Sequence, residues 1–290
     1  MNAALDLRRL LESQALLTAM AAHNPLTACM VEEAGFDAIW ASGFELSASM
    51  GVPDASIVSM DEHLDMTQRM AERVSLPVIA DIDTGFGNAV NVHYAVKRYI
   101  NAGTAAIVME DKNFPKDTSL REGGRQKLVP IEEFEGKIQA ALDASGDSGL
   151  VLIARTEALI AGAGVDEALK RARAYSECGA DMILVHSKSP TPDELLEFIN
   201  RWELETAIVI VPTAYPQFDE HQARETGKIK LVIYGNHCIR AGITGIRDTF
   251  KRIRAEGSAA GVDSDITPVK EVIALQGDAD MRLIEKRFLR

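Results

Sequence analysis

The chain alternates short apolar runs with longer stretches in which apolar residues recur every three or four positions. The short runs consist mainly of Val, Ile, Leu and Ala, a composition typical of parallel strands that are buried on both faces. The longer stretches have the period of amphipathic helices. Strands are therefore expected at residues 16–21, 36–41, 78–80, 105–109, 150–154, 182–185, 207–211 and 231–234.

Helices are expected before and between these strands. Asn24 followed by Pro25 is typical of a helix start, with Asn24 as the N-cap. Two segments, residues 46–59 and 111–128, have no clear period and are expected to form long loops, which in such folds usually carry function. The expected helices are residues 4–14, 25–35, 61–74, 91–102, 131–144, 166–178, 192–202, 220–226, 239–255 and 269–288.

Strands that alternate regularly with helices predict a parallel α/β protein. Eight such units favour a closed (β/α)8 TIM-type barrel over an open doubly wound sheet. A chain of 290 residues is ordinary for one barrel, and no stretch has the composition of a linker. We therefore expect residues 1–290 to form a single barrel domain.

The charge of the chain limits its partners. The formal net charge is -12, and binding to nucleic acid or to an anionic membrane requires a basic face. Both partners are therefore disfavoured. A small anionic substrate stays compatible with this charge if a metal ion and one or two basic side chains form a local positive site.

Cysteine usage and the amino terminus indicate a cytoplasmic protein. Cys29, Cys178 and Cys238 are odd in number and lie in helical patterns, so we expect buried free thiols in a reducing compartment. Residues 1–10 lack the apolar core of a signal peptide, and no apolar run reaches the roughly 18 residues of a membrane span.

Polar residues gather where the expected strands end, and barrel enzymes place their active sites at the carboxyl ends of their strands. The pattern therefore predicts an enzyme rather than a binding or scaffold protein. The polar residues are Ser42, Asp81, Asp83, Glu110, Arg155, Glu157, His186, Thr213 and Asn236.

The third strand ends in two carboxylates, Asp81 and Asp83, and a Gly-x-Gly loop follows directly. Residues i and i+2 of a strand point to the same side, so we expect both carboxylates to project together, near Glu110 on the next strand. Single carboxylates at such places often cap helices or form ion pairs. Three of them favour a hard divalent ion such as Mg²⁺, which prefers oxygen ligands.

Arg155 and His186 each end an apolar strand. Arg155 is expected to pair with a carboxylate such as Glu157 or Glu110, or to hold a phosphoryl or carboxylate group in its planar fork. His186 is expected either in the core or in the site. The loop that carries Lys116 and Thr118 is long and lies above the same strand ends, so it is a candidate lid.

Several motifs, taken together and in order, resemble the phosphoenolpyruvate mutase/isocitrate lyase superfamily. The similarity covers nearly the whole chain. The motifs are Trp40-x-Ser42-Gly43, Asp81-x-Asp83-Thr84-Gly85-x-Gly87-Asn88, Glu110-Asp111-Lys112, Arg155-x-Glu157-Ala158, His186-Ser187 and Val269-Lys270-Glu271.

The resemblance implies a modified (β/α)8 barrel, Mg²⁺ (with Mn²⁺ or another divalent ion as a substitute) and enolate chemistry on 2-oxo acids. It also implies a homotetramer, a dimer of dimers, in which residues 268–290 form a C-terminal helix that packs on a neighbouring subunit. Lyases of this superfamily carry a cysteine motif in the lid. The corresponding residues 114–119 contain no cysteine, so carbon–carbon cleavage is disfavoured.

The Phe-Pro-Lys sequence at residues 114–116 resembles the phosphonate branch of the family. Mutases of that branch have Asn at the position of Thr118. The chain has Lys116-Asp117-Thr118-Ser119-Leu120 there, which resembles the members that hydrolyse phosphonopyruvate. We therefore expect Mg²⁺-dependent hydrolysis of 3-phosphonopyruvate to pyruvate and phosphate. The mutase reaction is the alternative, and a 2-oxo acid lyase is a weaker one.

The resemblance also implies roles for individual residues. Asp81 is expected as the direct metal ligand, with Asp54, Asp83 and Glu110 reaching the ion directly or through water. Trp40, Ser42, Gly43 and Phe44 are expected to bind the substrate, and Arg155 and His186 to contact its phosphonyl group. The expected catalytic residues are Asp54, Lys116, Thr118, Arg155 and His186.

Overall fold

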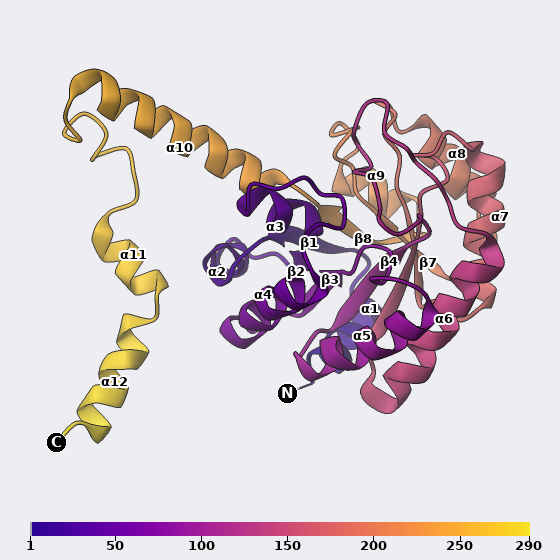
Figure 1. Cartoon of the computed structure of the whole chain (residues 1–290), viewed down its shortest axis with the longest axis horizontal. Helices are drawn as coiled ribbons and strands as arrows, with labels where there is room; N and C mark the ends of the chain where they lie inside the picture. The colour runs from indigo at the N-terminus through magenta and orange to yellow at the C-terminus, as the bar shows by residue number, and fades with distance from the viewer. Residues whose placement is uncertain (1) are drawn as a thin grey trace. The chain divides into compact units, whose positions relative to one another are not determined.

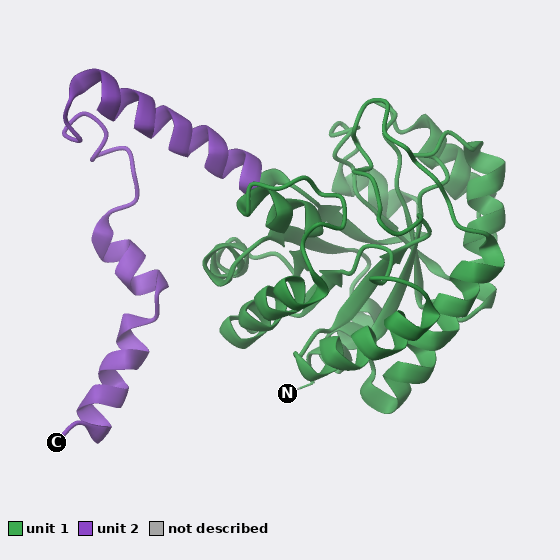
Figure 2. Ribbon diagram, in the orientation of Figure 1, with its two compact units in different colours: residues 1–237 green, residues 238–290 purple. Residues whose placement is uncertain are grey.

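The structure is a computed structural model that describes residues 2–290. The chain divides into two compact units, Met1–His237 and Cys238–Arg290 (Figure 2). The first unit contains all eight strands, and the second contains helices only.

The first unit is a closed barrel of eight parallel strands, so the predicted fold class is confirmed (Figure 1). Each strand pairs with the next in the chain, and β8 pairs with β1 to close the sheet. The strands are β1 (Leu17–Ala22), β2 (Ala38–Ala41), β3 (Val78–Asp81), β4 (Ala106–Glu110), β5 (Val151–Thr156), β6 (Met182–Val185), β7 (Ala207–Ile210) and β8 (Ile229–Tyr234).

Helices connect successive strands. The predicted start at Asn24 is confirmed, because its side chain accepts a hydrogen bond from Thr27 N–H in a capping box. The helices are α1 (Ala3–Ser13), α2 (Pro25–Glu33), α3 (Gly43–Ser49), α4 (Met60–Arg73), α5 (Ala89–Asn101), α6 (Ile131–Ser145), the 3-10 helix η1 (Gly146–Ser148), α7 (Gly164–Glu177), α8 (Asp193–Arg201) and α9 (Glu220–Glu225).

The two faces of the strands form separate cores. One buried cluster contains residues from all eight strands and from α1, among them Leu17, Trp40, Ile79, Val108 and Ile153. No helix between strands contributes to it, so this cluster fills the barrel interior. The residues of opposite parity, such as Ala80 and Ile107, pack against the surrounding helices.

This alternation positions the polar strand ends. Continuing the inward-facing positions by two residues leads from Trp40 to Ser42, from Val108 to Glu110 and from Ile153 to Arg155. The polar side chains at the strand ends thus continue the inward-facing rows and reach the carboxyl mouth of the barrel.

The prediction of an uninterrupted loop over residues 46–59 was wrong in its first part. Residues Gly43–Ser49 form α3, which Ser42 caps by accepting a hydrogen bond from Glu45 N–H at 3.2 Å. The helix has only seven residues, too few for a helical period to be visible in the sequence.

The second unit contains α10 (His237–Glu256), α11 (Val269–Leu275) and α12 (Asp278–Phe288). The prediction of one helix over 269–288 was wrong, because Gly277 has a φ of 82° and separates α11 from α12. Within residues 2–290, no helix combines the length and the apolar character needed to cross a lipid bilayer.

Two of the three cysteines are less buried than predicted. Cys29 is buried, whereas Cys178 and Cys238 are partly exposed. No disulfide joins any of these three side chains in the described chain.

Candidate active site

A small pocket of about 60 Å³ lies at the carboxyl mouth of the barrel. Among the residues expected in the site, it brings together Trp40 and His186, which lie 146 positions apart in the sequence. Its polar and aromatic lining comprises Trp40, Ser42, Phe44, Asp54, Asp81, Lys116, Thr118, Ser119, Arg155, His186, Thr213 and Asn236. Gly43, Asp83 and Glu110 lie beside it, in contact with lining residues. Every residue expected in the site is therefore at this mouth.

Asp81 and Asp83 face the same point, but not by strand alternation as predicted. Strand β3 ends at Asp81, and Asp83 has a φ of 51°, outside any strand. Asp83 N–H donates to Asp81 Oδ1 at 3.2 Å. A Cβ atom added to Gly43 would lie 3.2 Å from Asp83 Oδ1 and 3.5 Å from Asp81 Oδ2. Both carboxylates therefore crowd the Gly43 backbone, where a larger residue would disturb them.

Aromatic packing against α5 stabilises the loop after Asp83. Phe86 has a φ of 59° and stacks on Tyr99, with the ring centroids 6.4 Å apart. The buried His63 contacts Tyr99 Oη at 2.8 Å. A Cβ at Gly85 would lie 2.4 Å from the side chain of Val92, so only glycine fits there. This explains the Gly-x-Gly sequence as a tight turn beside the carboxylates.

The electrostatics of this corner suit a cation. Burial raises the pKa of Asp81, and burial raises the pKa of Asp83 to about 7. Within the described chain, neither side-chain oxygen of Glu110 accepts a hydrogen bond, although both are buried. Glu110 has only ion-pair contacts, with Lys112 at 3.3 Å and Arg155 at 3.4 Å, so its buried oxygens keep lone pairs that a hard divalent ion can use. The residues therefore fit Mg²⁺.

The lid lies over these carboxylates. Lys116 Nζ is 2.6 Å from Asp83 Oδ1 and 3.0 Å from Asp54 Oδ1, and its side chain is only 5% exposed. The Thr118 hydroxyl donates to the backbone carbonyl of Asp54 at 2.7 Å. The loop that carries Asp54 and the lid thus meet directly above the site.

Arg155 forms the ion pair expected for it and also faces the pocket. Its Nε donates to Glu157 Oε1 at 2.7 Å, and the side chain also lines the pocket. Arg155 Nη2 lies 2.8 Å from His186 Nδ1. Burial, reinforced by the Arg155 charge, lowers the pKa of His186, which favours a neutral imidazole. His186 therefore lines the pocket and is not a member of the apolar core clusters.

Two polar residues of this cluster were missed as site residues. Lys112 Nζ donates to Ser119 Oγ at 2.7 Å and lies 3.2 Å from Glu157 and 3.3 Å from Glu110. Ser119 Oγ in turn donates to Glu157 Oε2 at 2.5 Å. The available signal was the position of Lys112 only two residues after the fourth strand, where an apolar environment demands a counter-charge.

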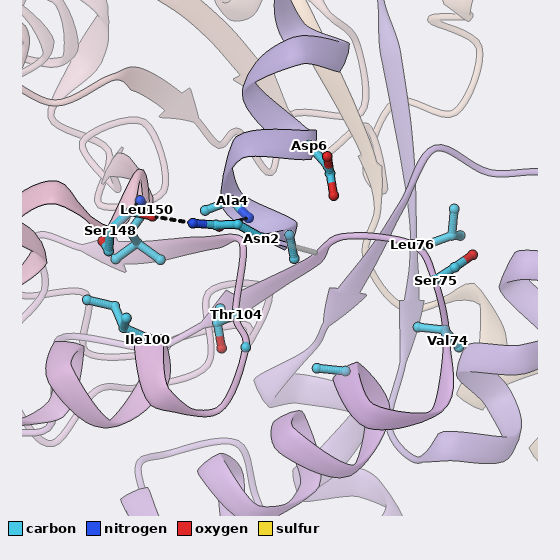
Figure 3. Close-up of a pocket in the computed structure, with 13 residues that line it drawn as sticks. Asn2, Ala4, Asp6, Val74, Ser75, Leu76, Ile100, Thr104, Ser148 and Leu150 are labelled. Carbon is cyan, nitrogen blue, oxygen red and sulfur yellow. Dashed lines mark hydrogen bonds between the residues drawn. The ribbon is translucent and has the colours of Figure 1, made fainter.

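A larger cavity of about 550 Å³ lies at the opposite end of the barrel (Figure 3). Its lining comes from the start of α1, from the last turns of α4 and α5, and from loops that precede strands, the last of these shown by Ser75, Thr104 and Ser148. Asn2 donates from its side chain to Ser148 O at 3.1 Å across one edge. Asp6 is the one ionisable residue among its described lining residues, so this cavity lacks the grouped charges of the pocket at the carboxyl mouth.

Comparison with known proteins places the chain among enzymes of known type. The family profile described as phosphoenolpyruvate phosphomutase matches residues 7–254. The chain is 58% identical over 284 residues to the phosphonopyruvate hydrolase of Variovorax sp. (strain Pal2), covering 98% of each chain.

Two solved structures are similar over nearly their full length. A phosphonopyruvate hydrolase in complex with oxalate and Mg²⁺ is 55% identical, with a TM-score of 0.95 and full coverage of both chains. A phosphoenolpyruvate phosphomutase from Streptomyces platensis subsp. rosaceus is 46% identical, with a TM-score of 0.96 and 99% coverage of both chains.

Proposed function

The chain belongs to the phosphoenolpyruvate phosphomutase family, and on this premise we propose that it hydrolyses 3-phosphonopyruvate to pyruvate and phosphate with Mg²⁺. The observation that carries the proposal is the 58% identity with a phosphonopyruvate hydrolase over 98% of both chains. The fold by itself does not separate the two reactions, because TM-scores of 0.95 and 0.96 are equivalent. Which of the two reactions the chain catalyses therefore depends on individual side chains in the site.

Asp81, Asp54, Asp83 and Glu110 would hold the Mg²⁺ ion, directly or through water. When bound, the ion supplies a Lewis acid for the negative charge that develops on the keto oxygen of the substrate. In the reaction the carbon–phosphorus bond breaks, its electron pair passes into the pyruvate enolate, and the enolate takes up a proton. A water molecule provides the oxygen that joins phosphorus.

The carboxylate and keto end of the substrate is assigned to the turn at Ser42, which joins β2 to α3 at the mouth of the barrel. The backbone N–H groups of Gly43 and Phe44, in the first turn of α3, are suited to hold its oxygens, and Trp40 forms a wall. The Ser42 N–H donates to Ala22 O at 3.3 Å instead. The Ser42 hydroxyl donates to Gly235 O at 3.1 Å, which fixes this turn against the segment after β8. Rigid placement of such donors lowers the barrier because no reorganisation is needed during the reaction.

The phosphonyl group is assigned to Arg155 and His186. Glu157 binds Nε of the guanidinium, and Nη2 contacts His186 and Ser119, so Nη1 is the nitrogen best placed to face the pocket. A buried cation at this position stabilises the charge on the phosphorus oxygens as the bond breaks.

Lys116 and Thr118 close the site from above, and Asp54 lies beside both. The Thr118 hydroxyl donates its proton to Asp54 O in a hydrogen bond, so the hydroxyl oxygen can accept a hydrogen bond from a water molecule. We assign to Thr118 the orientation of the water that attacks phosphorus, either directly or after transfer of the phosphoryl group to Asp54.

The competing function is the interconversion of phosphoenolpyruvate and phosphonopyruvate, because the mutase structure superposes equally well. Incubation with phosphonopyruvate and Mg²⁺, followed by phosphorus NMR, distinguishes the two. Inorganic phosphate together with pyruvate is the expected result. Accumulation of phosphoenolpyruvate would assign the chain to the mutases, and an unchanged substrate would refute both functions.

We predict that Thr118→Asn lowers the hydrolysis rate about 100-fold, the loss typical of a misplaced reactant. Mg²⁺ affinity, measured by calorimetry, should stay within about twofold, because the described hydrogen bond of the Thr118 hydroxyl is to the backbone of Asp54 and not to a carboxylate. The matched control is Thr191→Asn at an exposed position, which should behave as the unaltered protein. Loss of Mg²⁺ binding in Thr118→Asn would contradict the role given to the hydroxyl.

We further propose that residues 268–290 pack on a neighbouring subunit of a homotetramer, a dimer of dimers. The support is a set of apolar side chains that the single chain leaves exposed, among them Val269, Leu283 and Phe288 at 75%, 65% and 59%. Light scattering should give a mass about four times the 31.5 kDa of one chain. Leu283→Asp should lower that mass; a monomeric mass for the unaltered protein would refute the assembly.

We also propose a cytoplasmic location. The lack of any disulfide among the described cysteines is compatible with a reducing compartment. Fractionation of the source cells with an antibody against the chain tests this, and recovery outside the cytoplasm would contradict it.

A further inference from the structure

Two loops meet above the candidate active site. One connects α3 to α4 and carries Asp54 and Ser56, and the other is the lid that carries Lys116 and Thr118. The lid is tied to the barrel at its base, where Lys112 and Leu128 form an antiparallel bridge. Its inner part contacts the barrel through Ser119, which donates to Glu157 Oε2 at 2.5 Å, and contacts the first loop through Lys116 and Thr118.

The contacts between these two loops form a regular set. Lys116 N–H donates to Ser56 Oγ at 3.1 Å, and the Thr118 hydroxyl donates to Asp54 O at 2.7 Å. Residue 54 therefore faces residue 118, and residue 56 faces residue 116, as in two segments that run in opposite directions. Both donors lie on the lid and both acceptors lie on the first loop, and each bond joins a side chain to a backbone group.

The Ser56 contact has a particular consequence for Lys116. The hydroxyl binds the backbone N–H of the residue whose ammonium group lies between Asp54 and Asp83. The backbone of Lys116 is thereby held at one end and its charge at the other. Because Asp54 is only two residues from Ser56, a lid that moves away pulls on the loop that carries Asp54.

We propose that Ser56 is a positioning residue that seats Lys116 between the carboxylates and makes the two loops open and close together. The expected effect of this movement on catalysis rests on the proposed function. The joint movement of the two loops does not. Ser56 touches no reacting atom, so its effect is on the fraction of molecules with a closed site.

Hydrogen exchange followed by mass spectrometry tests the joint movement in the substrate-free protein. In Ser56→Ala, peptides covering residues 51–58 and 113–125 should both exchange about threefold to tenfold faster, the effect of losing one hydrogen bond. Ser56→Gly serves as a second variant, because Ser56 has a φ of 55° that glycine adopts without strain. Both variants lack the hydroxyl and should behave alike.

Ser49→Ala is the matched control, since Ser49 Oγ donates to Leu46 O within its own helix. Equal exchange in Ser56→Ala and the unaltered protein would overturn the proposal. Faster exchange in the lid alone would overturn it as well, and so would faster exchange in the Ser49 control. These results do not depend on which reaction the enzyme catalyses.

Kinetics give a second readout that separates positioning from general stability. In Ser56→Ala, KM for phosphonopyruvate should rise about threefold to tenfold while kcat changes less than about twofold, because saturating substrate restores the closed site. A purely structural defect would lower the active fraction and hence kcat at unchanged KM. That pattern would overturn the role given to Ser56.

Discussion

Asp81→Asn is expected to abolish measurable Mg²⁺ binding and to lower kcat/KM for phosphonopyruvate at least about 1,000-fold. Asn has the shape of Asp but no charge, so the change removes the ligand and leaves the packing intact. Because burial raises the pKa of Asp81, the ionised carboxylate destabilises the metal-free fold at neutral pH. The metal-free variant should therefore unfold at the same temperature as the unaltered protein or at a higher one.

Thermal unfolding with and without Mg²⁺ measures both effects in one experiment. Added Mg²⁺ should raise the unfolding temperature of the unaltered protein but not that of Asp81→Asn. Asp65→Asn is the matched control, since Asp65 is exposed and pairs only with Arg69 among the ion pairs of the described chain. If Mg²⁺ stabilises Asp81→Asn as strongly as the control, Asp81 is not the ligand that we assign.

Arg155→Lys is expected to lower kcat/KM about 100-fold to 1,000-fold although the positive charge is kept. The guanidinium donates from Nε to Glu157 at 2.7 Å and from Nη2 to Ser119 at 3.2 Å, and Nη2 also lies 2.8 Å from His186 Nδ1. An ammonium group is a point charge that cannot keep these three contacts and also face the phosphonyl group. The loss should therefore appear in kcat and leave Mg²⁺ affinity nearly unchanged.

Arg201→Lys provides the control for this change. Arg201 also pairs with two carboxylates, Asp166 and Glu197, but it lies on the exposed side of α8. Exposed ion pairs contribute little, so steady-state kinetics of this variant should match the unaltered protein. An Arg155→Lys enzyme that retains more than about a tenth of the activity would contradict the role of the planar fork.

The mouth of the barrel shows what a local sequence pattern can predict. The alternation of side chains along a strand predicts that Arg155 and Glu110 face the same side as the buried Ile153 and Val108, and the structure agrees. The same rule gave the wrong reason for Asp83, whose φ of 51° follows from the tight turn at Gly85 and the packing of Phe86 on Tyr99. Backbone conformations with positive φ depend on such packing and cannot be read from a period of two.

The sequence by itself determined the eight-stranded barrel, the end of the barrel that carries polar groups and the family to which the chain is similar. These features depend on periodicity and on short motifs, which are local properties of the chain. The tertiary structure alone decided that Lys116 lies between Asp54 and Asp83, that Lys112 and Glu157 hold Arg155 and Ser119, and that Ser56 meets the lid. Those contacts join segments separated by up to 62 positions, such as Asp54 and Lys116. Only the side-by-side pairing of β2, β3, β4 and β5 brings the loops at their carboxyl ends within hydrogen-bond distance.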